Sequence, residues 1–114
     1  MTIILVKMAR QQPYALIYAP QVKEHLRAIE PNHHSLIRGK VEEQLVFEPA
    51  VETRNGKPLR QPAALGAEWE LRFGPANRFR VFYEIDPDNR EVHILAIGVK
   101  ERDRLFIGGE EVEL

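Results

Sequence analysis

Apolar residues occupy every second position along residues 68–84, on both sides of a short Gly-Pro-Ala-Asn turn at residues 74–77, and the residues between them are charged except Phe82. A period of two on either side of such a turn is typical of a β-hairpin. Residues directly opposite each other in an antiparallel pair share one face of the sheet. The pattern therefore predicts three apolar pairs on one face: Trp69 with Tyr83, Leu71 with Val81, and Phe73 with Phe79.

The same register places Arg72 opposite Arg80 on the other face of the hairpin. Like charges directly across a ladder are destabilising. A hairpin that keeps two arginines there favours an anion site, and phosphate is the anion that we expect. The alternative is a pair of solvated arginines on the wet face of an antiparallel sheet.

The N-terminal half predicts one strand followed by two helices. Residues 13–19 alternate as a strand, and Pro20 suits the first turn of a helix. That helix carries Val22, Leu26 and Ile29 on one side and ends before Pro31. A second helix is expected from about residue 32 to Pro49. Its inward-facing residues are expected to be Leu36, Ile37, Val41, Leu45 and Val46.

The C-terminal half predicts a loop, the hairpin and one more strand. Residues 50–64 read as a loop, and residues 86–89 as a turn. Residues 92–99 are apolar on both sides and suit a central strand, with Val92, Ile94 and Ala96 facing away from His93. Residues 100–106 are expected to form one helical turn, and residues 110–114 a polar tail.

This order predicts an α+β fold: an N-terminal strand, an αα-hairpin, and a three-stranded antiparallel meander that completes a twisted sheet with helices packed on one face. A chain of 114 residues suits one domain, here 1–114, with an N-terminal extension (1–12) and an acidic C-terminal tail (108–114). Without cysteine, thiolate metal sites and disulfides are excluded. The apolar run 3–6 is too short for a membrane span or a signal peptide, so we expect a cytoplasmic protein without a membrane partner.

The net charge of −1 hides an uneven distribution. Residues 54–80 carry six basic and two acidic side chains, whereas residues 84–114 carry four basic and nine acidic ones. A basic centre beside an acidic end fits a local phosphate-binding face, although chance clustering in a short chain is the alternative. The adjacent His33 and His34 point about 100° apart on a helix, so we expect a solvated helix start and no metal site. His93 is expected to be structural.

Several motifs together resemble the RelE/ParE superfamily of toxins from bacterial type II toxin–antitoxin systems. They are Lys57-Pro58-Leu59-Arg60, Trp69-Glu70-Leu71-Arg72, Arg78-Phe79-Arg80-Val81-Phe82-Tyr83, and Ile94-Leu95-Ala96-Ile97-Gly98 before a Lys/Arg-rich turn. The resemblance covers about residues 14–107. It implies a metal-independent, ribosome-dependent mRNA endonuclease, without a cofactor, that inhibits translation.

The resemblance also implies residue roles. Arg80 falls at the arginine that contacts the scissile phosphate, Arg72 where a catalytic lysine often occurs, and Lys100 at the basic residue after the last strand. Glu70 replaces a second lysine and is expected to act as a general base or as an ion-pair partner between the two arginines. The expected RNA contacts are Lys57, Arg60, Arg78, Arg102 and Phe106. Phe106 replaces a tyrosine, so it can stack on a base but cannot carry a proton.

Two other functions remain open: a ParE-like inhibitor of DNA gyrase, and a non-catalytic relative that only binds its antitoxin. The toxin interpretations imply a cognate antitoxin as partner, with the ribosome and mRNA as targets of the endonuclease. They also imply a homodimer or a toxin–antitoxin heterotetramer. The antitoxin is expected to cover exposed apolar surface or a sheet edge.

Overall fold

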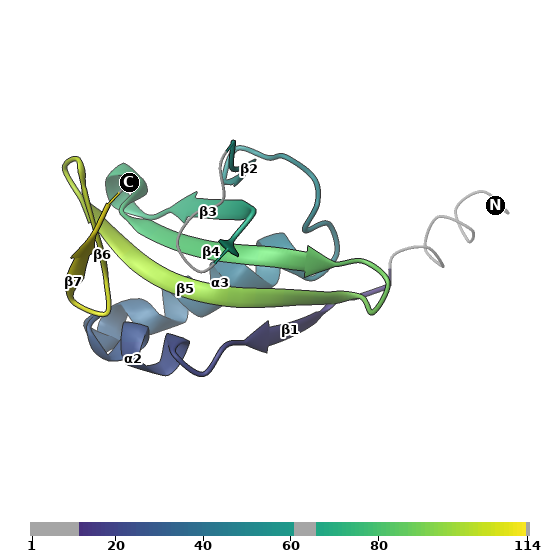
Figure 1. The fold of residues 1–114 in the computed structure, drawn as a ribbon, viewed down its shortest axis with the longest axis horizontal. Coiled ribbons are helices and arrows are strands. Elements are labelled where there is room, and N and C mark those ends of the chain that lie inside the picture. The colour runs from purple at the N-terminus through teal and green to yellow at the C-terminus, as the bar shows by residue number, and fades with distance from the viewer. Residues whose placement is uncertain (1–11, 61–65, 114) are drawn as a thin grey trace, which may run out of the picture.

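The computed structural model describes residues 12–60 and 66–113 of the chain. The expected N-terminal extension, except its last residue, and residues 61–65 of the expected loop lie outside this part. Two helices lie against one face of a twisted sheet (Figure 1), so the predicted α+β arrangement is confirmed. The strands run in the order β2 (Gly56–Pro58), β3 (Trp69–Phe73), β4 (Phe79–Asp86), β5 (Glu91–Glu101), β6 (Arg104–Ile107) and β7 (Glu110–Val112), and β1 (Ala15–Tyr18) pairs with β5. No helix in the described part of the chain is long and apolar enough to cross a membrane.

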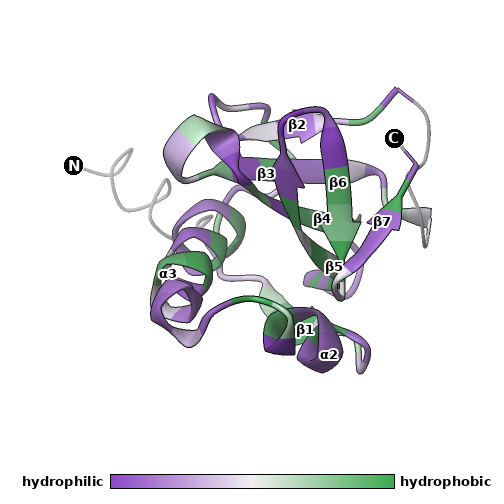
Figure 2. Ribbon diagram, turned by 90° about the vertical axis from the view of Figure 1, so that its left-hand side faces the viewer, coloured by the Kyte–Doolittle hydropathy of each residue, from purple (hydrophilic) through white to green (hydrophobic). Residues whose placement is uncertain are grey.

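The N-terminal strand and both helices form where the sequence predicts them. Strand β1 (Ala15–Tyr18) pairs in parallel with β5, and helix α2 (Val22–Arg27) follows. A 3₁₀ turn (Pro31–His33) leads into α3 (His34–Leu45). Green and purple bands alternate along α3 (Figure 2), because its buried residues recur at helical spacing. They are Ile37, Val41 and Leu45.

One of the expected inward-facing residues of α3 points outward. Leu36 is 41% exposed, although its neighbour Ile37 is buried. Consecutive helical residues point about 100° apart, so one apolar stripe could not bury both. Val46 is half-buried just beyond the helix.

Strands β3 (Trp69–Phe73) and β4 (Phe79–Asp86) form the predicted hairpin in the predicted register. The three apolar pairs face the helices, and Arg72 lies opposite Arg80 on the other face. Gly74 begins the turn with φ of 82°. A Cβ atom there would lie 2.6 Å from Cδ2 of Phe79, so the turn requires glycine for its backbone and for its space.

Strand β5 (Glu91–Glu101) occupies the centre of the sheet, as predicted, but contains a bulge. Phe82 pairs with Ala96 and the next residue of β4, Tyr83, pairs with Ile94, so Leu95 is the additional residue. The bulge reverses the alternation of side chains along β5. Ile94 therefore packs toward the helices while Ala96 faces away from them, which corrects the expected shared face.

The C-terminal segment forms strands instead of the expected helical turn and polar tail. Strand β5 continues to Glu101, and a turn at Arg102 and Asp103 leads into β6 (Arg104–Ile107). Strand β7 (Glu110–Val112) then pairs with β6. The expected loop likewise contains a short strand, β2 (Gly56–Pro58), at the edge beside β3. Pairing to a neighbouring strand outweighs the weak local pattern of such short segments.

The two faces of the sheet carry different groups. The main core lies between the sheet and the helices, on what we call the helix face; it includes Leu71, Val81 and Ile97. The opposite, outer face has a smaller apolar cluster of Ala67, Phe82, Ala96 and Leu105. Most of the predicted site residues lie on the outer face beside this cluster.

Candidate functional site

Three charged side chains on the outer face form one connected group. Arg72 Nε donates a hydrogen bond to Glu70 Oε1 at 2.5 Å, and Arg80 Nη1 donates to Glu70 Oε2 at 3.3 Å. Arg80 Nε also donates to the carbonyl oxygen of Asn77 at 2.9 Å. One carboxylate thus bridges two guanidinium groups that face each other across the ladder, and the group keeps a formal charge of +1.

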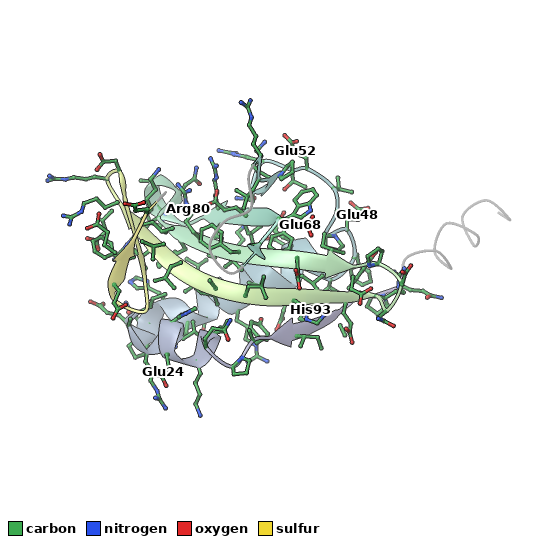
Figure 3. The ribbon with its side chains drawn as sticks, in the orientation of Figure 1. Glu24, Glu48, Glu52, Glu68, Arg80 and His93 are labelled. Carbon is green, nitrogen blue, oxygen red and sulfur yellow. The ribbon has the colours of Figure 1, made fainter. Side chains whose placement is uncertain are left out.

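The members of this group differ in exposure. The side chains of Glu70 and Arg80 are only 6% and 9% exposed, whereas that of Arg72 is 42% exposed. Arg80 belongs to β4 and lies opposite Arg72 of β3, near the end of the sheet that carries β6 and β7 (Figure 3). A ligand from solvent would therefore meet Arg72 first, with Arg80 held beneath the surface. Guanidinium groups can bind anionic oxygens through paired hydrogen bonds, so these two arginines are the groups of the outer face that could take part in an anion site.

The turn before β2 fixes the backbone of Arg72. Asn55 Nδ2 donates to the Arg72 carbonyl oxygen at 2.8 Å, and the Arg72 N–H donates to the Asn55 carbonyl oxygen at 2.8 Å. Thr53 Oγ1 accepts from the backbone N–H of Gly56 at 2.8 Å. The predicted Asn-Gly turn therefore anchors β2 and places Lys57 opposite Glu70 on the outer face. Lys57 Nζ donates to Glu52 at 3.3 Å.

Lys100 shares the outer face with the two arginines. Arg80 pairs with Gly98, and alternation along β5 puts Lys100 on the same side two residues further on. Its backbone N–H donates to the carbonyl oxygen of Arg78 at 2.7 Å. Gly98 has no room for a side chain, because a Cβ atom would lie 2.7 Å from the Phe106 carbonyl oxygen. The glycine lets β6 pack closely beside the strand that carries Lys100.

Other predicted residues lie elsewhere. Phe106 pairs with Val99, whose side chain packs against the helix-face core, so Phe106 faces away from Arg80. Arg78 lies near Phe106, and both line a cavity on the helix face. Arg60 is exposed beyond β2, and Arg102 is exposed at the tip of the β5–β6 turn. The structure thus groups Lys57, Glu70, Arg72, Arg80 and Lys100, and separates the other four from them.

The helix-face cavity has a volume of about 330 Å³ and lies between the end of α2, the strands β5 and β6, and the turn at Gly108 and Gly109. Its polar lining residues are His25, Glu30, His33, Arg78 and Glu101. The backbone N–H of Ile97 donates to His25 Nδ1 at 3.2 Å, and burial lowers the pKa of this histidine. The sequence analysis did not predict this cavity. It assigned residues 100–106 to a helical turn, so it could not place Phe106 on the helix face of the sheet.

An apolar groove of about 680 Å³ lies between β1, α2 and α3. Leu16, Val22, Leu26 and Ile37 are among its lining residues, and Tyr18 closes one side. Burial, and secondarily Glu42, raise the pKa of Tyr18. Ile17 and Tyr18 are 40% and 42% exposed, and the outer edge of β1 pairs with no strand in the described ranges.

The model of one protein family, the ParE toxins of type II toxin–antitoxin systems, matches residues 16–104. The chain belongs to this family.

A solved structure supports the same assignment. The toxin–antitoxin complex RelBE2 from Mycobacterium tuberculosis contains a chain that matches with a TM-score of 0.63 and 26% sequence identity. The match covers 78% of the present chain and 93% of the other one. A search of curated proteins finds no matching sequence. The RelE/ParE resemblance of the motifs is therefore confirmed.

The ParE family match ends before Phe106. It includes Glu70, Arg72, Arg80 and Lys100, but it excludes most of β6 and all of β7. The wall of the helix-face cavity that contains Phe106, Gly108 and Gly109 thus lies outside the matched region.

The histidines of this ParE-family chain have structural contacts. His34 Nε2 lies 2.9 Å from the carbonyl oxygens of Leu26 and Ile29, so it caps the end of α2 and is not simply solvated. His33 packs on the ring of Phe79. In the described ranges, one group has three potential metal-ligand atoms within 4.8 Å: Asp86, Glu91 and His93. His93 Nε2 lies 3.1 Å from Glu91 Oε1, and Asp86 accepts two hydrogen bonds from Asn89.

Proposed function

We propose that this toxin of a type II toxin–antitoxin system is a metal-independent mRNA endonuclease that acts on the ribosome. The observation that supports the proposal is the pair Arg72 and Arg80, which share one face and one bridging carboxylate, with Lys100 on the same face. Two arginines joined through one carboxylate, with a lysine on the same face of the sheet, suit a phosphate group whose charge increases during reaction.

The proposed reaction is an attack of the RNA 2′-hydroxyl on the adjacent phosphate. The new bond joins the 2′-oxygen to phosphorus, and the bond from phosphorus to the 5′-oxygen breaks. The 2′-hydroxyl loses its proton and the leaving 5′-oxygen gains one. Arg72 and Lys100 bind the phosphoryl oxygens from the surface, and Arg80 adds positive charge from below. Lys57 lies on the same face, where it suits an RNA backbone contact.

Glu70 has a positioning role in this proposal. Both of its carboxylate oxygens accept hydrogen bonds from arginines, and the side chain is almost fully buried. It holds the two guanidinium groups at one site against their mutual repulsion. A carboxylate engaged in this way suits orientation of the arginines better than removal of a proton from RNA.

The second candidate function is inhibition of DNA gyrase without cleavage of RNA. Two observations favour it: the matching family is that of ParE toxins, and the Arg80 guanidinium is largely buried and paired with Glu70. An ion pair that only stabilises the fold would account for the burial of Arg80, and it would need no substrate. The two candidates differ in whether Arg72 and Lys100 are needed for toxicity.

We also propose an antitoxin as the partner, since the similar RelBE2 chain was solved in a toxin–antitoxin complex. The outer edge of β1, which pairs with no strand among residues 12–60 and 66–113, can accept an extended segment, and the adjacent apolar groove can accept its side chains. Ile17 and Tyr18, which are exposed in the isolated chain, would be covered.

The test is expression of the chain without an antitoxin, followed by mapping of mRNA 5′ ends on ribosomes and by a DNA supercoiling assay. The wild type should arrest growth and cut ribosome-bound mRNA. The double variant Arg72→Gln, Lys100→Gln should lose at least about 100-fold in cleavage, because it removes two charges from the transition state. Arg38→Gln is the matched control, since Arg38 is an exposed arginine on α3 that pairs with Glu42.

Arg80→Ala should also abolish cleavage, with circular dichroism used to check that the variant folds. Growth arrest with intact mRNA and blocked supercoiling would overturn the endonuclease proposal in favour of gyrase inhibition. Antitoxin binding without growth arrest would identify a binding-only relative.

A further inference from the structure

The helix-face cavity is separate from the cationic group of the outer face, because the sheet lies between them. Its lining includes six side chains of four chemical types: His25, His33, Glu30, Glu101, Arg78 and Phe106. Its volume of about 330 Å³ is at the lower end of the range for small-molecule sites, roughly 300–1,000 Å³. Apolar side chains, among them Ile29, Ile97 and Val99, form the floor.

The polar groups at the rim have few partners. Arg78 Nη2 lies 3.9 Å from Glu101 Oε1, a loose contact between side chains that are 42% and 62% exposed. Across residues 12–60 and 66–113, the side chains of Glu30 and His33 have no hydrogen-bond or ion-pair partner. The Arg78 guanidinium also lies 5.5 Å from the centroid of the Phe79 ring. A ligand at the mouth of the cavity would therefore meet the Glu30 carboxylate and the loosely paired Arg78 and Glu101.

Two aromatic rings complete the lining. Phe106 projects from β6, and His33 packs on Phe79 with ring centroids 5.2 Å apart. His25 uses Nδ1 to accept from Ile97, so the proton of its neutral ring is on Nε2, which can donate. The turn at Gly108 and Gly109 has positive φ at both residues and packs near His25 and Ala28. The backbone of Gly108 and Gly109 therefore forms part of the cavity wall, together with the side chains.

We propose that this cavity binds a guanine base. Guanine has two adjacent donors on its Watson–Crick edge, N1–H and N2–H₂, which match a single carboxylate such as Glu30 or Glu101. Its O6 and N7 acceptors match an arginine, the commonest specific partner of guanine, and here that is Arg78. Its flat ring suits stacking on the face of the Phe106 ring opposite the Arg104 guanidinium, which lies 5.5 Å from the ring centroid.

Other bases fit this set of groups less well. Adenine presents an acceptor at N1, which a carboxylate repels, and cytosine and uracil have too little ring surface to fill the same space. A metal ion also fits poorly, since within the described residues the cavity's carboxylates and histidines do not form a group of three ligand atoms within 4.8 Å. The guanine inference concerns the opposite face from the proposed RNA-cleaving group and does not depend on that activity.

The experiment is a titration of the purified full-length chain with guanosine 5′-monophosphate and, separately, adenosine and uridine 5′-monophosphates, by calorimetry and by ¹H–¹⁵N spectra. The guanosine nucleotide should bind at least about tenfold more tightly, with shifts at the amides around His33, Ile97 and Phe106. Phe106→Leu keeps an apolar side chain in the strand and should weaken binding by about tenfold through loss of the stack. Glu30→Gln should reduce the preference for guanine, whereas Arg38→Gln on α3 should leave binding unchanged.

The source of the base is tested with single-stranded RNA pentamers that differ by one guanine-to-adenine change. Tighter binding of the guanine pentamer than of the free nucleotide would identify a base within RNA as the ligand. Tighter binding of the free guanosine nucleotide than of the guanine pentamer would identify a free nucleotide as the ligand. Equal affinity for all three nucleotides, or spectral shifts that are confined to the outer face, would overturn the proposal.

Discussion

Strand β4 forms two cross-strand pairs of like-charged residues on the outer face, one near each end of the strand. Arg72 lies opposite Arg80, and Asp86 lies opposite Glu91. Figure 3 labels Arg80 at one end and His93, which lies near the acidic pair, toward the other. Both pairs oppose pairing of the strands to a similar degree by charge alone, yet the chain neutralises them in different ways.

Burial explains the difference. At the basic end Arg80 is 9% exposed, and the buried Glu70 carboxylate lies between the two arginines. At the acidic end Glu91 and His93 are 35% and 34% exposed, and Asp86 is bonded to Asn89 in its own turn. Water screens the acidic pair, so it requires no buried counterion. The basic pair requires one, because an uncompensated charge below the surface is costly.

The largest expected effect comes from removal of the counterion. Glu70→Ala should lower the free energy of unfolding by about 3–5 kcal/mol, because it leaves the Arg80 guanidinium buried without its carboxylate. Urea denaturation followed by circular dichroism measures the change. The matched variant at the other end, Asp86→Ala, should lower the free energy of unfolding much less, because water screens its carboxylate. Equal losses would show that burial does not distinguish the two ends.

The next prediction tests whether the buried group serves stability or function. The double variant Glu70→Leu, Arg80→Met replaces the buried pair by apolar side chains of similar size. Such replacements are often neutral or stabilising by about 1–4 kcal/mol, so the double variant should be clearly more stable than Glu70→Ala. Thermal unfolding measures this. The double variant should also lose the proposed RNA cleavage completely. A double variant as unstable as Glu70→Ala would indicate that the pair is required for folding itself.

The basic end was largely predictable from sequence, whereas the surroundings of Phe106 were not. A strict period of two fixed the register of β3 and β4, and hence the meeting of Arg72 and Arg80. Glu70 as the bridge between them was one of two predicted alternatives. In contrast, the β5–β6 turn consists of Arg102 and Asp103, without the glycine or asparagine that usually marks a two-residue hairpin loop. Without that signal, Phe106 could not be assigned to a strand or to a face.

The bulge at Leu95 shows a second limit. In a run that is apolar on both faces, one additional residue does not interrupt any pattern, so the reversal at Ala96 leaves no trace in the sequence. The helix-face cavity could not be predicted from the sequence either, because α2 and the strands β5 and β6, which line it, are distant along the chain. Pattern analysis thus predicts neighbours within a ladder well and contacts between layers poorly.

A smaller effect is expected from the two turns at the ends of β5, each of which contains an arginine with positive φ. Arg102 has φ of 59° and is exposed, so Arg102→Gly should stabilise the chain by about 0.5–1 kcal/mol by relieving the left-handed strain. Arg90 has φ of 51°, but its guanidinium lies 4.5 Å from the ring of Tyr14 and donates to Gln12. Arg90→Gly should therefore be destabilising, because the lost contacts exceed the relieved strain. Thermal unfolding of both variants measures the difference, and an equal gain in both would contradict it.

The smallest expected effect is a pH dependence confined to the acidic end. Hydrogen bonds from the Asn89 side chain and backbone hold the pKa of Asp86 below its ordinary value of 3.8. A carboxyl group whose pKa is lower in the folded state adds stability above its unfolded pKa, and this stability is lost as the pH falls through the folded value. The difference in unfolding free energy between wild type and Asp86→Asn should therefore be present at pH 5–7 and shrink as the pH falls below about 4. Urea titrations at a series of pH values measure it, with Asp88→Asn in the same turn as the control for the change in net charge. If the two variants gave the same pH profile, general charge repulsion, and not the hydrogen bonds from Asn89, would account for the stability at this end of the sheet.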